Sequence, residues 1–256
     1  MLKAWLAHPL TRDLDIDSPE TTHLRHQIIQ EKGFLQQIYR EWYTAIVQAL
    51  PKQDGFVLEL GSGAGFLNDF VPDVITSGLF PCPGINIVLD GQQLPFADTT
   101  LRGIVMTNVL HHLPYPRRFF SQATRTVRPG GVIVMIEPWV TTWSRLIYSN
   151  LHHEPFSPEA QTWEFASSGS LSGANGALPW IMFERDRSLF EQQFPEWRVQ
   201  TIDLKMPFCY LLSGGVSQRS LMPGWSFRGW CKLEYLLQPW IDNWAMFAQI
   251  VLVRSN

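Results

Sequence analysis

Apolar residues recur along the chain in two patterns whose order predicts an α/β fold. From 18 to 50 they follow a helical spacing, with Ser18 placed as the N-cap and Pro19 in the first turn. From Phe56 onward, short apolar runs alternate with segments suited to short helices or turns. Such runs are typical of strands buried in a parallel sheet. The predicted strands cover 56–60, 74–76, 86–90, 103–107 and 132–136.

The C-terminal part predicts an antiparallel addition to this sheet. Residues 197–204 and 247–254 both have strand patterns, and 207–244 form an insertion between them. Segments 139–151 and 183–194 are predicted helices. We therefore predict a single domain with a Rossmann-like, doubly wound seven-stranded sheet, mostly parallel with an antiparallel C-terminal hairpin. Its expected parts are an N-terminal helix, a cofactor-binding core and two covering regions, over 18–50, 55–138, 139–195 and 205–245.

Composition excludes several classes of protein. Hydrophobic residues make up 45% of the 256 residues, which suits a folded core, and the net charge of −3 does not favour a nucleic-acid partner. No apolar run is long enough for a membrane span, so we expect no integral membrane association. Cys82, Cys209 and Cys231 follow no metal or disulfide pattern. Together with the absence of a signal-peptide pattern, this predicts a cytoplasmic protein.

A glycine-rich loop follows the first predicted strand. Gly61, Gly63 and Gly65 permit a tight turn and a close approach to a ligand at the carboxyl end of that strand. The loop lacks the Gly-Lys-Ser/Thr ending of a phosphate-binding loop. Glu59 lies two residues before Gly61. A dinucleotide-binding loop does not need an acidic residue there, so Glu59 favours a cofactor other than a dinucleotide.

Four segments in order resemble motifs of the class I S-adenosylmethionine-dependent methyltransferases, in particular the type 11-like group. They are VLELGSGAGF (57–66), DGQQLPFAD (90–98), TNVLHHLP (107–114) and RPGG (128–131). The resemblance covers roughly residues 55–138, about a third of the chain. It implies this family's fold and S-adenosyl-L-methionine as the cofactor.

The resemblance also implies roles for individual residues. The loop glycines would approach the methionine part and the ribose, and Glu59 would anchor the amino group or order the loop. Asp90 would contact the adenine amine with Gln92 nearby, and Asn108 and Val109 would lie near the sulfonium. The complete set expected to contact the cofactor is Glu59, Gly61, Ser62, Gly63, Gly65, Asp90, Gly91, Gln92, Asn108 and Val109.

One position departs from the family pattern. The second strand usually ends in Asp or Glu, which binds the ribose hydroxyls, whereas Thr76, Ser77 and Gly78 stand here. Losing this charged acceptor would weaken cofactor binding by roughly 1–3 kcal/mol, unless Ser77 or a backbone group replaces it. The departure keeps open a non-catalytic, cofactor-binding module.

His111 and Glu137 are the candidate catalytic residues. They follow the fourth strand and end the fifth, so both should lie at the carboxyl edge of the sheet. A hydroxyl acceptor needs a base, and a carboxylate could orient the imidazole. Some sugar O-methyltransferases of the family use a His and an acid in these places, and the resemblance implies the same here. Alternatively, His111 and His112 merely line the pocket.

Two further clusters stay open to interpretation. His152, His153 and Glu154 are adjacent and do not share a helical face, and we see no second cluster to complete a metal site. We therefore expect a polar rim and no metal. The insertion is rich in aromatic residues, which we expect to pack as the core of a cap; a substrate pocket and a membrane-interface patch are alternatives. These residues are Trp225, Phe227, Trp230, Tyr235, Trp240, Trp244 and Phe247.

The combined expectation is a methyltransferase that acts on a small-molecule acceptor. Oxygen is slightly preferred as the acceptor atom because of the candidate base His111. The alternatives are the non-catalytic module and a membrane-associated lipid or quinone methyltransferase.

Overall fold

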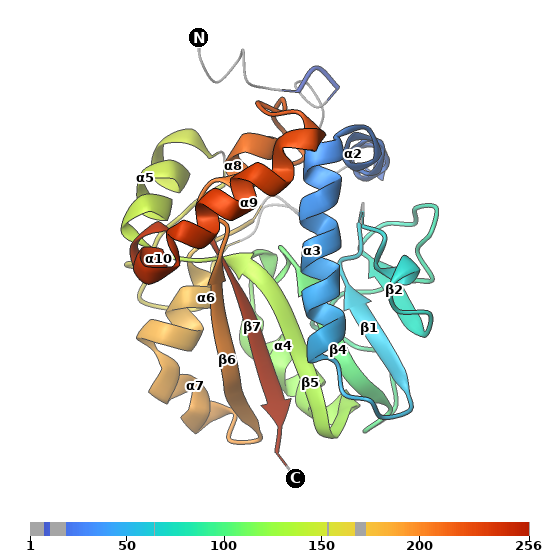
Figure 1. Ribbon diagram of the computed structural model, residues 1–256. Coiled ribbons are helices and arrows are strands. Elements are labelled where there is room, and N and C mark those ends of the chain that lie inside the picture. The colour runs from blue at the N-terminus through green and yellow to red at the C-terminus, as the bar shows by residue number, and fades with distance from the viewer. Residues whose placement is uncertain (1–7, 11–18, 64, 153, 167–172, 256) are drawn as a thin grey trace.

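The computed structural model describes residues 8–10, 19–63, 65–152, 154–166 and 173–255. A single seven-stranded sheet runs through the molecule in the order β3-β2-β1-β4-β5-β7-β6. In Figure 1, helix α3 lies in front of this sheet and α4 lies behind it. The strands are β1 (Phe56–Leu60), β2 (Val74–Gly78), β3 (Ile87–Val88), β4 (Leu101–Thr107), β5 (Val127–Pro138), β6 (Trp197–Lys205) and β7 (Phe247–Arg254).

The sheet has the predicted mixture of directions. Strands β1 to β5 pair in parallel, and β7 pairs antiparallel with both β5 and β6. The fold class is therefore confirmed. The chain leaves β1 toward β2 on one side, and β4 and β5 lie on the other side. This reversal between β1 and β4 is the place where open α/β sheets bind ligands.

The N-terminal helix is divided at Lys32, so the prediction of one continuous helix over 18–50 is wrong. Lys32 has φ −90° and ψ 85°, which is not helical. Its buried Nζ donates to the carbonyl oxygens of Gly215 and Gln218, each at 2.6 Å. These carbonyl groups lie in a distant part of the chain, and their contacts with Lys32 stabilise the break in the helix. The two helices are α2 (Pro19–Glu31) and α3 (Gly33–Ala49), and the predicted cap Ser18 lies outside the described residues.

The other helices are short and mostly cover the sheet or its carboxyl edge. The RPGG segment at 128–131 is part of β5, where Gly130 has φ +76° and the pairing with β4 shifts register. The helical segments are η1 (Leu67–Asp69), η2 (Leu110–His112), α4 (Pro116–Thr126), α5 (Thr142–Leu151), α6 (Leu178–Trp180), η3 (Ile181–Arg185), α7 (Arg187–Gln193), α8 (Cys209–Ser213), η4 (Gly224–Ser226), α9 (Phe227–Leu236), η5 (Gln238–Trp240) and α10 (Ile241–Trp244).

Successive side chains along a strand point to opposite faces of the sheet, so a hydrophobic core forms on each face. Ile133 and Met135 of β5 join one buried cluster, while Val134 and Ile136 join the other. Phe120 of α4 packs in the first cluster and Trp42 of α3 in the second. The sheet is thus covered on both faces, which leaves its carboxyl edge for ligands.

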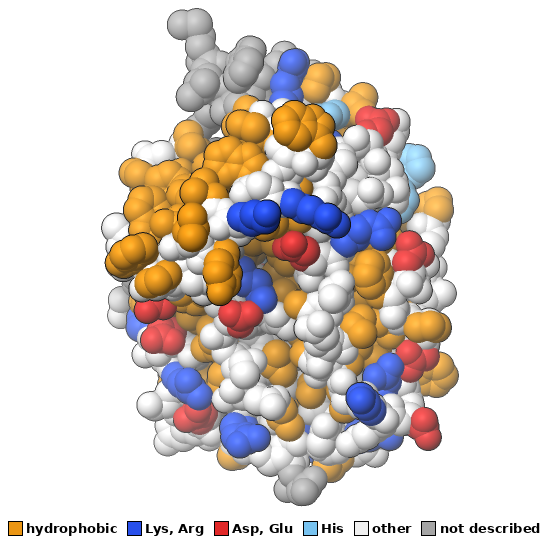
Figure 2. All heavy atoms as spheres, viewed as in Figure 1, with side chains coloured by type: hydrophobic (Ala, Val, Ile, Leu, Met, Phe, Trp, Pro, Cys, Tyr) orange, Lys and Arg blue, Asp and Glu red, His pale blue; other side chains and the backbone are white. Residues whose placement is uncertain are grey.

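The inserted segment lies beyond that edge, beside α3 (Figure 1). Phe227 is buried there, as a cap core requires. However, Trp225, Tyr235 and Trp240 are 87%, 76% and 58% exposed, so the prediction that these side chains form a core is wrong. Figure 2 shows an apolar region at the upper left of the molecule, over the inserted segment. Among the described residues, no helix has the length and apolar character needed to cross a bilayer.

Candidate functional site

A cavity of about 360 Å³ opens at the carboxyl ends of the parallel strands. Its walls come from the loop after β1, the segments after β3 and β4, and residues around α5 and α8. Every residue that the sequence predicts to contact the cofactor lines this cavity, and so do His111 and Glu154. The structure thus brings the candidate binding residues and His111 into one space, whereas Glu137 lies behind His111 and does not line the cavity.

The loop after β1 needs glycine for two physical reasons. Gly61 and Gly63 have φ +67° and +47°, in the left-handed region that favours glycine. A Cβ on Gly61 would lie 2.7 Å from Cγ2 of Val109, and one on Gly65 would lie 2.3 Å from Oη of Tyr43. Side chains at these positions would push apart the loop and its neighbours, so glycine here permits close packing around the cavity.

Glu59 places a carboxyl group beneath the loop. It is 4% exposed, and burial raises its pKa to about 7. Its Oε2 has no hydrogen-bond partner among the described residues. A buried oxygen without a partner is costly, and a cationic ligand in the cavity would remove that cost.

Asp90 and Gln92 form a turn on another wall of the cavity. Oδ1 of Asp90 accepts hydrogen bonds from the backbone N–H and the side-chain amide of Gln92, at 2.9 and 3.2 Å. Gly91 between them permits contact with β1, since a Cβ there would lie 2.7 Å from Cδ2 of Leu60. The turn therefore presents the Asp90 carboxylate at the cavity wall, and hydrogen bonds from Gln92 fix its position.

Ser77 does not replace the missing acid as a partner for the ribose hydroxyls. Its fully buried Oγ donates to the carbonyl oxygen of Glu59 at 2.8 Å, and its N–H donates to Oγ of Ser62 at 3.0 Å. The side chain therefore stabilises the loop, so its candidacy as a replacement for the missing acid is wrong. Gly78 itself lines the cavity, which leaves backbone groups as the candidate replacement.

His111 and Glu137 contact each other, as the sequence predicts. Nδ1 of His111 lies 2.6 Å from Oε2 of Glu137, and the two side chains are 2% and 0% exposed. Oε1 of Glu137 accepts from the N–H groups of Val109 and Leu110 at 2.8 and 2.7 Å. Burial opposes the imidazolium, but the charge of Glu137 outweighs it and raises the pKa of His111 to about 10. Without a ligand, His111 is therefore protonated at neutral pH.

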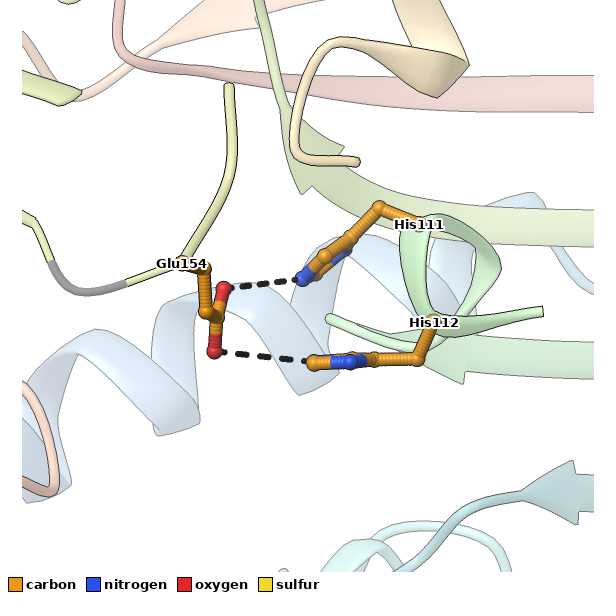
Figure 3. Close-up of side chains that lie close together, drawn as sticks. All are labelled: His111, His112 and Glu154. Atoms are coloured by element: carbon orange, nitrogen blue, oxygen red, sulfur yellow. Dashed lines mark ion pairs between the residues drawn. The ribbon is translucent and has the colours of Figure 1, made fainter. Parts of the chain in front are cut away.

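Glu154 faces His111 and His112, a contact that the sequence analysis did not predict. Its Oε2 lies 3.5 Å from Nε2 of His111, and its Oε1 lies 3.7 Å from Nε2 of His112 (Figure 3). Burial opposes ionisation of Glu154, yet the hydrogen bond and charge of His111 hold its pKa well below the usual range. Burial and the charge of His111 lower the pKa of His112 to about 4.

The expectation that no other polar cluster joins Glu154 is therefore wrong, because His111 and His112 face it. His152 also lies near, with Nδ1 3.8 Å from Oε2 of Glu154, whereas His153 lies outside the described residues. The only signal in the sequence is a run of polar residues after a helix. It does not reveal that the segment folds back onto η2.

Comparison with known proteins agrees with this geometry. A family model described as a methyltransferase domain matches residues 76–135. This match covers less than half of the chain and supports the resemblance to the class I S-adenosylmethionine-dependent methyltransferases. The chain is 34% identical over 53 residues to an uncharacterized methyltransferase of Mycobacterium tuberculosis, a match that covers 21% of each chain. It is 26% identical over 101 residues to one of Mycobacterium leprae, covering 33% of this chain and 38% of that relative. The matches thus span well under half of these curated relatives.

Solved methyltransferases share the whole fold. Geranyl diphosphate C-methyltransferase from Streptomyces coelicolor superposes with a TM-score of 0.54 at 14% identity, covering 98% of this chain and 90% of that one. A possible histamine N-methyltransferase from Thermotoga maritima superposes with a TM-score of 0.51 at 15% identity, covering 91% and 99%. At such identities the likeness concerns the fold alone.

The family that the chain resembles uses S-adenosylmethionine as its cofactor, and the cavity described above fits this molecule chemically. The cofactor carries a cationic amino group, and Glu59 offers a buried carboxyl oxygen without a partner. The glycine loop leaves space that Cβ atoms would fill or distort. Both observations favour a ligand that combines positive charge with close contact to the backbone.

Proposed function

We propose that this protein transfers a methyl group from S-adenosylmethionine to a small-molecule acceptor, preferably at an oxygen atom. The observation that carries the proposal is the unpartnered Oε2 of Glu59 within the glycine-lined cavity. Glu59 would bind the amino group, the glycine loop the methionine part and ribose, and Asp90 with Gln92 the adenosine part. The bound cofactor supplies an electrophilic methyl group on a sulfonium.

The segment after β4 would position the acceptor. Asn108 has φ +58°, an uncommon conformation for a residue other than glycine, and its N–H donates to the carbonyl of Ile136 at 2.9 Å. The next two N–H groups donate to Glu137. This backbone is held firmly beside the cavity, which favours alignment of reacting groups.

His111 would manage the proton of a hydroxyl acceptor at Nε2. Glu137 keeps Nδ1 protonated, so Nε2 is the atom available to the cavity and to Glu154. Nε2 can accept a proton from the hydroxyl only after its own proton has passed to Glu154 or to solvent. Tyr148 and Phe156 line the same cavity, and their apolar rings would exclude water from the acceptor.

Calorimetric titration with S-adenosylmethionine tests the proposal directly. We expect saturable binding, weakened in Glu59→Gln, and transfer of labelled methyl groups to members of a panel of small hydroxyl compounds. Absence of binding at millimolar cofactor would refute the proposal. Binding without transfer to any acceptor class would favour the non-catalytic module.

A membrane-associated lipid or quinone methyltransferase is the second candidate, because of the exposed aromatic face. We use this term for the exposed side chains of Trp225, Tyr235, Leu236 and Trp240 in the inserted segment, over which Figure 2 shows an apolar region. Trp and Tyr favour the interface of a bilayer, and Arg228 and Lys232 of α9 add positive charge nearby.

This face is connected to the cavity. The carboxylate of Glu234 in α9 accepts from the N–H groups of Phe208 and Cys209 at the start of α8, and Tyr210 of α8 lines the cavity. Co-sedimentation with anionic lipid vesicles tests this candidate. We expect the wild type to pellet and a Trp225→Ser, Trp240→Ser double variant to stay in the supernatant. A wild type that never pellets would rule out this candidate.

A further inference from the structure

Three side chains at one end of the cavity direct their donor atoms toward one another. Figure 3 shows the rings of His111 and His112, both from η2, facing the carboxylate of Glu154. One ligand atom from each residue lies within 4.8 Å of the other two. We propose that these residues bind one divalent transition-metal ion of the zinc class. The bound ion would occupy Nε2 of His111, so an acceptor would then be activated by coordination to the ion and not by that nitrogen; the inference therefore goes beyond the proposed function.

The distances leave room for a shared ion, because the contacts of His111 and His112 with Glu154 are long for hydrogen bonds. The two Nε2 atoms lie 3.5 and 3.7 Å from the carboxylate oxygens of Glu154. Charge-assisted hydrogen bonds between nitrogen and a carboxylate are shorter, about 2.7–2.9 Å. Two ligands bound tetrahedrally to one zinc ion, each about 2.0–2.1 Å from it, are separated by roughly 3.3 Å. The two nitrogen–oxygen distances lie closer to the second geometry, and the three donor atoms, which lie within 4.8 Å of one another, would move inward to bind one ion.

The other nitrogen of each imidazole already has the partner that a metal ligand needs. Nδ1 of His111 lies 2.6 Å from the carboxylate of Glu137, and Nδ1 of His112 lies 3.2 Å from the carbonyl oxygen of Gly173. Since a carboxylate and a carbonyl can only accept, both Nδ1 atoms carry the proton. Each Nε2 is then the atom that can offer a lone pair to a metal, and on His111 the ion would displace the Nε2 proton to solvent as it binds. Metal-binding histidines in proteins are typically oriented in this way.

The surroundings also suit an ion whose free coordination positions a substrate can reach. Two imidazoles and one carboxylate form the protein ligand set of many catalytic zinc sites and of non-haem iron sites, which leave coordination positions free. All three residues line the cavity, so the free positions would face the acceptor. The ligand class implied there is an oxygen donor such as a carboxylate, phenol or alcohol, which the ion would hold by direct coordination.

Metal titration of the full chain tests the site without cofactor or acceptor. The protein is stripped with a chelator, then titrated with Zn²⁺ by calorimetry and with Co²⁺ by visible absorption. We expect one ion per chain and the intense absorption of cobalt in a low-coordinate site. His112→Ala and Glu154→Gln should each weaken binding by at least about 100-fold. Glu137→Gln, which alters the partner behind His111, should weaken it by about 10- to 100-fold.

His23→Ala is the matched control, because this histidine is exposed on α2. It should bind Zn²⁺ as the wild type does. Circular dichroism checks the fold of each variant; if His112→Ala unfolds, Glu154→Gln decides, since its side chain is 22% exposed. Absence of saturable binding to the wild type would overturn the inference, and so would unchanged affinity in a folded Glu154→Gln protein. Intact zinc binding without cofactor binding would refute only the proposed function.

Discussion

Glu137 binds the side chain of His111 with one carboxylate oxygen and the backbone that carries this histidine with the other. Oε2 lies 2.6 Å from Nδ1 of His111, and Oε1 accepts from the N–H groups of Val109 and Leu110. The end of β5 thus fixes both the position of η2 and the orientation of its imidazole. Because both side chains are buried, neither can exchange its partner for water.

Glu137→Ala should therefore destabilise the whole domain. Removing one member of a buried charged pair costs about 3–5 kcal/mol, because the other is left unpaired. Urea denaturation should show this loss in the free energy of unfolding. Glu159→Ala is the control, since its exposed carboxylate pairs with Arg145 at the surface and should contribute less than about 1 kcal/mol. Equal stability of the two variants would contradict the role assigned to Glu137.

Glu59 should make cofactor binding depend on pH. Burial raises its pKa from 4.5 to about 7, so the neutral acid is favoured in the ligand-free fold. The stability from this shift is fully present below pH 4.5 and is lost as the pH rises through about 7. A cationic ligand favours the carboxylate instead, so S-adenosylmethionine should bind more tightly as the pH rises from about 5.5 to 8.

Binding below pH 7 should also release a proton, measurable by calorimetry in buffers of different ionisation enthalpy. Glu59→Gln should bind more weakly and lose both effects. Asp54→Asn, on the exposed segment before β1, should retain them. A wild-type affinity that does not change with pH would show that Glu59 does not meet the cation.

Gly65 and Tyr43 should show energetic coupling. A Cβ on Gly65 would lie 2.3 Å from Oη of Tyr43 and 3.0 Å from the carbonyl oxygen of Ser62. Gly65→Ala should thus reduce stability and cofactor affinity, and Tyr43→Phe in the same chain should restore part of both. A double-mutant cycle should give a coupling free energy of about 0.5–3 kcal/mol.

Gly229→Ala provides the control for that cycle. Its Cβ would meet no atom within 4 Å, and it lies in α9, so alanine should be neutral or stabilising by about 1 kcal/mol. If Gly65→Ala is as well tolerated as Gly229→Ala, close packing does not explain the glycine at position 65.

Lys32→Met should loosen the join between α2 and the loop at 215–218. The carbonyls of Gly215 and Gln218 would lose their donor, at a cost of about 1–3 kcal/mol. Burial lowers the pKa of Lys32 from 10.5 to about 8. The folded state therefore binds fewer protons than the unfolded state between these values, so this lysine makes stability rise with pH. Unfolding at pH 7.5 and about 9.5 should show this rise in the wild type but not in Lys32→Met.

Local patterns were sufficient to predict the sheet and its cofactor loop. A buried strand such as 132–136 shows itself through its own apolar residues, and the loop glycines follow a strand directly. The break at Lys32 depends instead on carbonyl groups far along the chain. The inward turn of Ser77 depends on the carbonyl of Glu59, and the contact of Glu154 with His111 depends on a loop path. Such features arise from tertiary contacts, which spacing along the chain does not record.

The central place of β7 sets an order for assembly of the protein. This strand lies between β5 and β6, although it follows both in the chain. During synthesis β6 therefore has no partner strand in this sheet until β7 emerges from the ribosome. The carbonyl of Met246, next to β7, also accepts from the N–H of Trp139 and from the hydroxyl of Tyr148, a wall of the cavity. The glycine loop of the cavity is therefore synthesised early, whereas the opposite wall can form only after β7 has been synthesised.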